Sequence, residues 1–212
     1  MDPEGPVWAV VVAAGRGERF GALKQYEPLG DRRVLDWSLA AAKAATDGVV
    51  LVVAPEHATD EERADAVVVG GATRSASVRA GLALVPAEAT VVVVHDAARP
   101  AASAALFGAV IAAVRSGADG AVPALPLSDT VKRVHDGRVV ETLDRTELVA
   151  VQTPQAFRAS ALRAAHATGG DATDDAALVE SAGGTVVVVP GDPDNVKVTS
   201  RSDLERLARV LA

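Results

Sequence analysis

A glycine-rich stretch with several cations follows the first strongly apolar run of the chain. Residues 7–14 are almost all Val and Ala, which is typical of a strand buried on both faces of a parallel sheet. Gly15 and Gly17 follow at once, and glycines let backbone N–H groups approach an anion closely. Arg19 and Lys24 add the positive charge that phosphate oxygens bind. The stretch therefore predicts a polyphosphate site at the carboxyl end of a strand.

The spacing of this stretch excludes two familiar phosphate-binding motifs. A dinucleotide-binding loop needs G-x-G-x-x-G, but Phe20 stands where the third glycine would be and Gly21 falls one residue late. A Walker A loop needs Ser or Thr directly after its lysine, and Gln25 follows Lys24. A glycine-rich turn whose arginines are simply solvated is the structural alternative.

Two later segments could bring chemistry to the same edge of the sheet. His95-Asp-Ala-Ala-Arg-Pro100 follows an apolar run, and a carboxylate at Asp96 that faces phosphates could hold Mg²⁺. The alternative for Asp96 is a cap on the next helix, and His95 is expected to pack in the core. Only four of the 21 basic residues are lysine. This bias favours a compact point charge for phosphate at Lys24 and Lys197.

Strands and helices alternate around these segments, which predicts a three-layer α/β/α sandwich with a mostly parallel, Rossmann-like sheet. Between two of them, Gly70-Gly-Ala-Thr-Arg-Ser-Ala-Ser77 offers glycines for close approach, and Ser75 or Ser77 could cap the helix or contact a ligand. A capping box at Ser202 and Glu205 is expected to open the last helix. The other predicted strands are 48–54, 66–69, 90–96, 120–125 and 185–189, and the helices are 34–46, 55–64, 74–85, 100–116, 158–167 and 174–182.

The alternation changes at residues 129–145, where apolar residues recur with period two around His135-Asp-Gly137. This pattern predicts a β-hairpin, which would be marginally stable alone. We expect the insertion, about 128–147, to be an arm that forms a homodimer, and a flap on its own domain is the alternative. Its exposed apolar residues would be Val131, Val134, Val139 and Leu143.

Composition narrows the classes of protein. A chain of 212 residues suits a single domain, 1–212, with the arm as an insertion. The net charge is −7 and the basic residues are scattered, so no nucleic-acid partner is expected. No apolar run approaches the roughly 18 residues that span a bilayer, so no membrane partner is expected. Without cysteine the chain forms no disulfides, which is typical of the cytoplasm.

The strings around Gly15 (A-A-G-R-G-E-R-F, then L-K-Q-Y), the segment 95–100 and Asp194-Asn-Val-Lys-Val-Thr199 resemble one family. It is the 2-C-methyl-D-erythritol 4-phosphate cytidylyltransferase family, small-molecule nucleotidyltransferases of the non-mevalonate isoprenoid pathway. The resemblance runs in order from Val10 to about Leu211. It implies transfer of CMP from CTP to the sugar-alcohol phosphate 2-C-methyl-D-erythritol 4-phosphate, with Mg²⁺ as cofactor and with 4-diphosphocytidyl-2-C-methyl-D-erythritol and pyrophosphate as products. A ribitol-5-phosphate cytidylyltransferase and a non-catalytic CTP-binding module are the alternatives.

The resemblance also implies roles for individual residues. The catalytic cations would be Arg19, Lys24 and Lys197. The residues that contact CTP would be Ala13, Ala14, Gly15, Gly17, Gly71 and Ser77. The residues that contact the acceptor would be Asp96, which also binds the metal, Arg99, Thr130, Arg145 and Thr173. Thr130 and Arg145 would act on the neighbouring subunit's site. The family often has Asp where this chain has Ala72.

Overall fold

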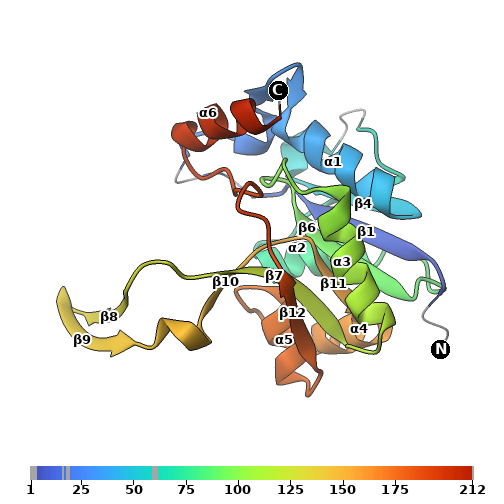
Figure 1. The fold of residues 1–212 in the computed structure, drawn as a ribbon. Helices are drawn as coiled ribbons and strands as arrows, with labels where there is room; N and C mark the ends of the chain where they lie inside the picture. Colours follow the sequence, from blue (N-terminus) through green and yellow to red (C-terminus); the bar gives the residue numbers. More distant parts are fainter. Residues whose placement is uncertain (1–3, 16, 18–19, 59–61, 212) are drawn as a thin grey trace.

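A single eight-stranded sheet organises the computed structural model, which describes residues 4–15, 17, 20–58 and 62–211 (Figure 1). Its strand order is β10-β7-β11-β6-β1-β4-β5, and β12 pairs with β7. The strands are β1 (Val7–Val12), β4 (Gly48–Val53), β5 (Ala66–Val69), β6 (Val91–Asp96), β7 (Gly120–Pro126), β10 (Val149–Val151), β11 (Gln155–Arg158) and β12 (Val186–Pro190). A separate short pair, β2 (Pro28–Leu29) and β3 (Arg32–Arg33), precedes the first helix.

Most pairings in the sheet are parallel, as the sequence predicts. Strand β1 pairs in parallel with β4 and β6, β4 with β5, and β12 with β7. Strands β10 and β11 are antiparallel to their neighbours. The central strands are buried on both faces, which explains why their sequences are continuous runs of Val rather than alternating patterns.

Helices cover both faces of the sheet and complete the three predicted layers. On one face, α1 and α3 pack through Leu35 and Phe107 against strand residues such as Val11. On the other face, α2, α4 and α5 pack through residues such as Val78 and Leu162. No helix in the described ranges is both long and apolar enough to cross a membrane. The helices are α1 (Val34–Ala45), α2 (Arg74–Leu82), α3 (Ala104–Arg115), α4 (Ala159–Ala167), α5 (Asp175–Ser181) and α6 (Arg201–Val210).

The helix predicted over 55–64 and the capping box predicted for the last helix both differ in the structure. The helix expected over 55–64 is only a 3-10 helix, Pro55–His57, in its described part. The Glu62 carboxylate lies 2.8 Å from Arg33 Nη2 and is nearly inaccessible, so a tertiary ion pair overrides the local helical pattern. The capping box of α6 uses Ser200 and Asp203 instead of Ser202 and Glu205, because the helix begins one residue after Ser200.

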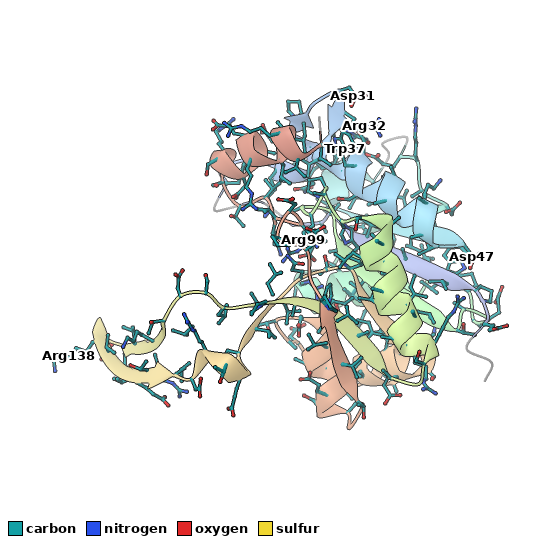
Figure 2. All side chains as sticks on the ribbon, viewed as in Figure 1. Asp31, Arg32, Trp37, Asp47, Arg99 and Arg138 are labelled. Carbon is teal, nitrogen blue, oxygen red and sulfur yellow. The ribbon has the colours of Figure 1, made fainter. Side chains whose placement is uncertain are left out.

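The predicted hairpin is confirmed and projects from the body of the protein (Figure 1). Strands β8 (Val131–His135) and β9 (Arg138–Leu143) form their own sheet and are joined by Asp136 and Gly137, which both have positive φ. Two such residues make the tight turn that suits the twist of a two-stranded ribbon. Figure 2 shows Arg138 at the outer end of this arm, remote from Arg99 in the body.

Candidate active site

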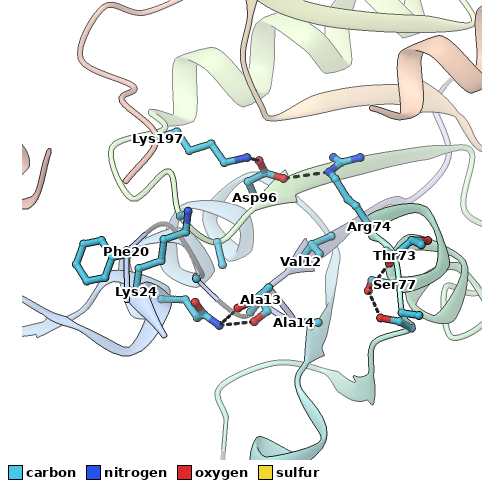
Figure 3. A pocket seen from close by; sticks show the side chains of 17 residues that line it. Val12, Ala13, Ala14, Phe20, Lys24, Thr73, Arg74, Ser77, Asp96 and Lys197 are labelled. Carbon is cyan, nitrogen blue, oxygen red and sulfur yellow. Dashed lines mark hydrogen bonds and ion pairs between the residues drawn. The ribbon is translucent and has the colours of Figure 1, made fainter. Parts of the chain in front are cut away.

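A cavity of about 770 Å³ opens at the carboxyl ends of β1 and β6 (Figure 3). The chain runs from β1 to β4 and β5 on one side and then returns to β6 on the other side of β1. A reversal of this kind leaves a crevice between the loops that follow the two central strands. The cavity is lined by Val12, Ala13, Ala14, Gly15, Gly17, Phe20, Lys24, Gln25, Gly71, Ala72, Thr73, Arg74, Ser77, Asp96, Ala97, Ala98 and Lys197.

The glycine loop after β1 is held in shape by Gln25. Its side-chain amide is buried and donates hydrogen bonds to the carbonyls of Ala13 at 2.7 Å and Gly15 at 3.0 Å. Gly17 has φ +64°, and a Cβ there would lie 1.9 Å from the carbonyl oxygen of Ala22. Only glycine fits this position without rearrangement. In the sequence, Gln25 only served to exclude a Walker A loop, and its role in holding the glycine loop was not predicted.

The segment 70–77 forms the opposite wall of the cavity. Thr73 is the N-cap of α2, and its hydroxyl accepts a hydrogen bond from the Ala76 N–H at 3.1 Å. The expectation that Ser75 or Ser77 caps this helix is therefore wrong. Ser77 lies one turn inside the helix, lines the cavity and donates to the Thr73 carbonyl at 3.0 Å.

Asp96 meets two cations at the rim of the cavity (Figure 3). Its Oδ2 lies 2.5 Å from Lys197 Nζ, and its Oδ1 lies 3.5 Å from Arg74 Nε. Burial alone would raise the pKa of this carboxyl, but the charges of Lys197 and Arg74 outweigh that effect and hold the pKa well below its usual range. Ser103 caps the next helix, α3, so the capping alternative for Asp96 is excluded.

Thr153 and His95 lie in the core next to Asp96 and are linked to it by hydrogen bonds. The Thr153 hydroxyl accepts a hydrogen bond from the Asp96 backbone N–H at 3.0 Å and lies 3.2 Å from His95 Nδ1. Burial lowers the pKa of His95 to about 4, although the nearby Asp96 charge opposes this change. His95 is fully buried beside the Phe107 ring, so it is the packed core residue that the sequence predicts.

A network of backbone contacts holds the loop that carries Lys197. Arg99 Nη1 donates to the Asn195 carbonyl at 2.7 Å, and Asn195 Nδ2 donates to the Thr153 carbonyl at 2.9 Å. Gln152 Nε2 also donates to the Asp192 carbonyl at 2.8 Å. Arg99 therefore braces the loop, and it is not among the residues that line the cavity. Its contact with substrate stays a prediction.

The cavity brings together nine of the predicted site residues, which come from four separate segments. These are Ala13, Ala14, Gly15, Gly17, Lys24, Gly71, Ser77, Asp96 and Lys197.

Three further predicted residues lie outside the cavity wall. Thr130 and Arg145 belong to the arm and its base, where Arg145 Nη1 donates to the Ser128 carbonyl. Thr173 is exposed just before Asp174, the N-cap of α5, and is not part of the cavity lining. Thr130, Arg145 and Thr173 do not contribute to the cavity wall in the described part of one chain. Arg19 lies outside the described residues.

Arg74 is a cavity residue that sequence reasoning missed. It lies at the first position of α2, and no acidic residue occurs in that helix's first turn. A cation at a helix N-terminus is opposed by the helix dipole, so its presence there is a signal that anions lie nearby. The sequence contains this signal, but only the fold shows which carboxylates pair with Arg74.

The charged groups of the described cavity lining are three cations, Lys24, Arg74 and Lys197, and one carboxylate, Asp96. Their formal charges sum to +2 in a chain whose net charge is −7. No cluster of three or more His, Asp, Glu or Cys side chains that could hold a metal occurs within the described ranges. A lone carboxylate fits Mg²⁺ that is held mainly by phosphate oxygens and water. The lining is thus suited to a polyanion and to charge that develops at phosphorus.

Comparisons with known sequences all point to one family. The profile of the IspD family, 2-C-methyl-D-erythritol 4-phosphate cytidylyltransferase, matches residues 7–212. A protein of that name from Cereibacter sphaeroides (strain KD131 / KCTC 12085) is 46% identical over 218 residues, which cover 96% of each chain. The bifunctional enzyme IspD/IspF of Anaeromyxobacter dehalogenans (strain 2CP-C) is 46% identical over 226 residues, 97% of this chain and 57% of that protein. The chain thus spans little more than half the length of such bifunctional relatives.

Solved structures agree with the sequence matches. The 2-C-methyl-D-erythritol 4-phosphate cytidylyltransferase from Thermus thermophilus superposes with a TM-score of 0.83 at 32% identity, over 95% of this chain and 97% of that chain. The bifunctional IspDF from Campylobacter jejuni gives a TM-score of 0.84 at 26% identity, over 95% of this chain and 54% of that chain.

Proposed function

Because the chain belongs to the 2-C-methyl-D-erythritol 4-phosphate cytidylyltransferase family, we propose that it transfers CMP from CTP to 2-C-methyl-D-erythritol 4-phosphate. The products are 4-diphosphocytidyl-2-C-methyl-D-erythritol and pyrophosphate. One observation of the structure supports the proposal independently of the similarity to this family. Lys24, Arg74 and Lys197 converge with Asp96 on one cavity of about 770 Å³, a size within the range of small-ligand sites.

CTP would lie along the loop after β1. Its triphosphate would contact the backbone at Gly15 and Gly17 and the ammonium of Lys24, because exposed N–H groups and a point charge suit phosphate oxygens. Its base would lie between Ala14 and Gly71, where a second cavity of about 600 Å³ adjoins the first and shares both residues. Ala13 and Ser77 complete this wall.

The reaction is a direct displacement at the α-phosphorus of CTP. A phosphate oxygen of the acceptor forms the new P–O bond, and the bond to pyrophosphate breaks with its electron pair on the leaving oxygen. Lys24 and Lys197 stabilise the charge that develops on the α-phosphate, and Arg19, which lies outside the described residues, is proposed as a third cation. Arg99 and Thr173 are proposed to contact the acceptor.

Mg²⁺ is the proposed cofactor, and Asp96 is the residue that would hold it together with phosphate oxygens and water. When bound, the ion would neutralise phosphate charge. Asp96 also holds Lys197, so the same carboxylate orients an ammonium toward the cavity. This double use explains why a single acidic residue lies among the cations of the described lining.

The arm is proposed to form a homodimer and to place Thr130 and Arg145 at the partner's cavity. Its apolar pairs support this: Val131 lies opposite Leu143 and Val134 opposite Val139 in the register, and Val134 and Val139 are more than half exposed. A ribbon that forms a sheet of its own gains stability by burying such side chains. We also propose a cytoplasmic location, which suits a chain without cysteine.

Pyrophosphate release tests the proposed reaction. Purified protein with Mg²⁺ and CTP should release pyrophosphate when 2-C-methyl-D-erythritol 4-phosphate is added. Ribitol 5-phosphate, and ATP, GTP or UTP in place of CTP, serve as controls and should give much slower release. Faster release with ribitol 5-phosphate would overturn the acceptor assignment. Tight CTP binding without release on either acceptor would overturn the enzymatic assignment.

A further inference from the structure

A line of polar and charged side chains runs from the cavity into the core behind it. Arg74, whose Nε faces Asp96, also places Nη1 2.7 Å from Oδ2 of Asp175. The other carboxylate oxygen of Asp175 lies 2.9 Å from His166 Nε2. Asp175 is fully buried and His166 is 4% exposed, and neither of them lines the cavity. The cavity rim is therefore tied to helices α4 and α5 through Arg74.

The position of Arg74 is unfavourable unless it serves these carboxylates. It stands at the N-terminus of α2, where the helix dipole opposes a cation, and its side chain is only 24% exposed. The buried Asp175 carboxylate needs a charged partner, because an unpaired buried ion is costly. Arg74 satisfies this need from one side of its guanidinium and reaches Asp96 from another.

We propose that Arg74 is a positioning residue for the nucleotidyl transfer proposed above, on which this inference rests. His166 holds Asp175, Asp175 fixes the guanidinium, and the guanidinium fixes Oδ1 of Asp96. The remaining oxygen, Oδ2, is then directed to Lys197. The chain of contacts thus sets the place of Asp96 and Lys197 relative to the α-phosphate. Small displacements of such groups reduce the rate of a reaction much more than they weaken binding.

The geometry requires arginine. Two different nitrogens of the planar guanidinium contact two carboxylates that come from β6 and α5. A lysine at this position would keep the charge but would present one ammonium, which cannot bridge both groups in the same way. Arg74→Lys therefore removes the bridge and retains the positive charge of the wall.

Arg79 provides a matched control on the same helix. Its Nη1 donates to the Gly170 carbonyl at 2.8 Å and its Nη2 lies 3.6 Å from Asp171, so it also links α2 to the segment before α5. Arg79 does not line the cavity and has no contact with Asp96 among the described interactions. If the arginines of α2 only join this helix to its neighbours, substituting either one should have similar effects. If Arg74 positions Asp96, only its substitution should lower the rate.

The experiment measures kcat, the KM for CTP and thermal unfolding of Arg74→Lys, Asp175→Asn and Arg79→Lys. We expect the first two to lower kcat roughly tenfold or more while the KM for CTP changes less than about threefold. Arg79→Lys should keep kcat near that of the unmodified chain. Should Asp175→Asn fail to fold, Arg74→Lys carries the test, because it keeps a cation beside the buried carboxylate.

A double-mutant cycle with Asp96→Asn separates positioning from general damage. Under single-turnover conditions, in which slow variants stay measurable, Arg74→Lys should add little to the loss caused by Asp96→Asn. An equal loss in both backgrounds, or an unchanged kcat for Arg74→Lys in an otherwise active protein, would overturn the inference alone. An unmodified chain that releases no pyrophosphate would instead overturn the proposed function.

Discussion

Lys197 Nζ lies 2.5 Å from Asp96 Oδ2, although 101 positions separate the two residues in the sequence. The contact joins the end of β6 to the loop before α6 and places opposite charges on one wall of the cavity. The carboxylate accepts a hydrogen bond from the ammonium and so orients it beside the loop that is proposed to bind phosphate. The pair therefore links the fold to the proposed reaction.

Lys24→Ala should lower turnover strongly and leave the fold intact. Lys24 lies in the cavity lining, and loss of one group that stabilises transition-state charge typically lowers kcat by about 10² to 10³. The matched control is Lys43→Ala, because Lys43 is exposed near the end of α1 and does not line the cavity. Steady-state pyrophosphate release and thermal unfolding measure both effects. Near-normal turnover of the Lys24 variant would refute its catalytic assignment.

Stability should fall in mild acid because of His95. Its folded-state pKa is about 4 and its ordinary value is 6.5, so between these values the unfolded chain binds a proton that the folded chain does not. The free energy of unfolding should therefore decrease as pH falls from about 6.5 to 4, by roughly 3 kcal/mol from this residue. His95→Asn should flatten this part of the profile in urea unfolding at several pH values. An identical slope in the variant would show that His95 is not responsible.

The two glycines of the first loop should respond differently to alanine. At Gly17 an added Cβ would collide with the Ala22 carbonyl, and the positive φ disfavours alanine. Gly17→Ala should lower the free energy of unfolding by roughly 2 kcal/mol or more. At Gly15 no atom of the described residues lies within 4 Å of an added Cβ, so Gly15→Ala should fold with nearly unchanged stability. Urea unfolding of both variants decides this, and equal losses would contradict it.

The arm should act on the partner's site. If Arg145 serves the other subunit, inactive Lys24→Ala and Arg145→Ala chains should complement each other when they are refolded together. Each mixed dimer would contain one intact site, so the mixture should recover on the order of a quarter of normal activity. A mixture that stays inactive, although sedimentation shows dimers, would mean that Arg145 does not act across the interface.

The homodimer itself should depend on the exposed apolar surface of the hairpin. Val139→Asp places a charge opposite Val134, at a position that is 61% exposed in a single chain. The unmodified protein should sediment as a dimer and the variant as a monomer, because burial of the new carboxylate is costly. Lys132→Ala on the same hairpin is the matched control, since it alters an exposed polar contact and should keep the dimer. A Val139→Asp variant that still sediments as a dimer would place the interface elsewhere.

Much of the fold follows from local sequence patterns. Continuous Val runs such as 91–94 indicate buried parallel strands, and the Asp136-Gly137 pair between alternating residues indicates the hairpin. Both patterns depend on neighbours in sequence, so they can be recognised without a structure. The cavity could likewise be anticipated at the ends of β1 and β6, because loops after adjacent parallel strands meet there.

Contacts between distant segments could not be predicted in this way. The ion pair of Glu62 with Arg33 replaces a helix that the local pattern favours. Arg74 bridges Asp96 and Asp175, and no spacing in the sequence announces that these three residues meet. Such contacts depend on how helices cross the sheet, and they decide which charged residues face the cavity.

A crystal structure of the protein with CTP and Mg²⁺ would show whether one bound nucleotide occupies the cavity that Lys24, Asp96 and Lys197 line. We expect the triphosphate to lie along Gly15 and Gly17, with the ammonium groups of Lys24 and Lys197 in contact with phosphate oxygens and the base beside Gly71. A nucleotide bound away from this cavity, or one whose phosphates contact neither lysine, would contradict this expectation.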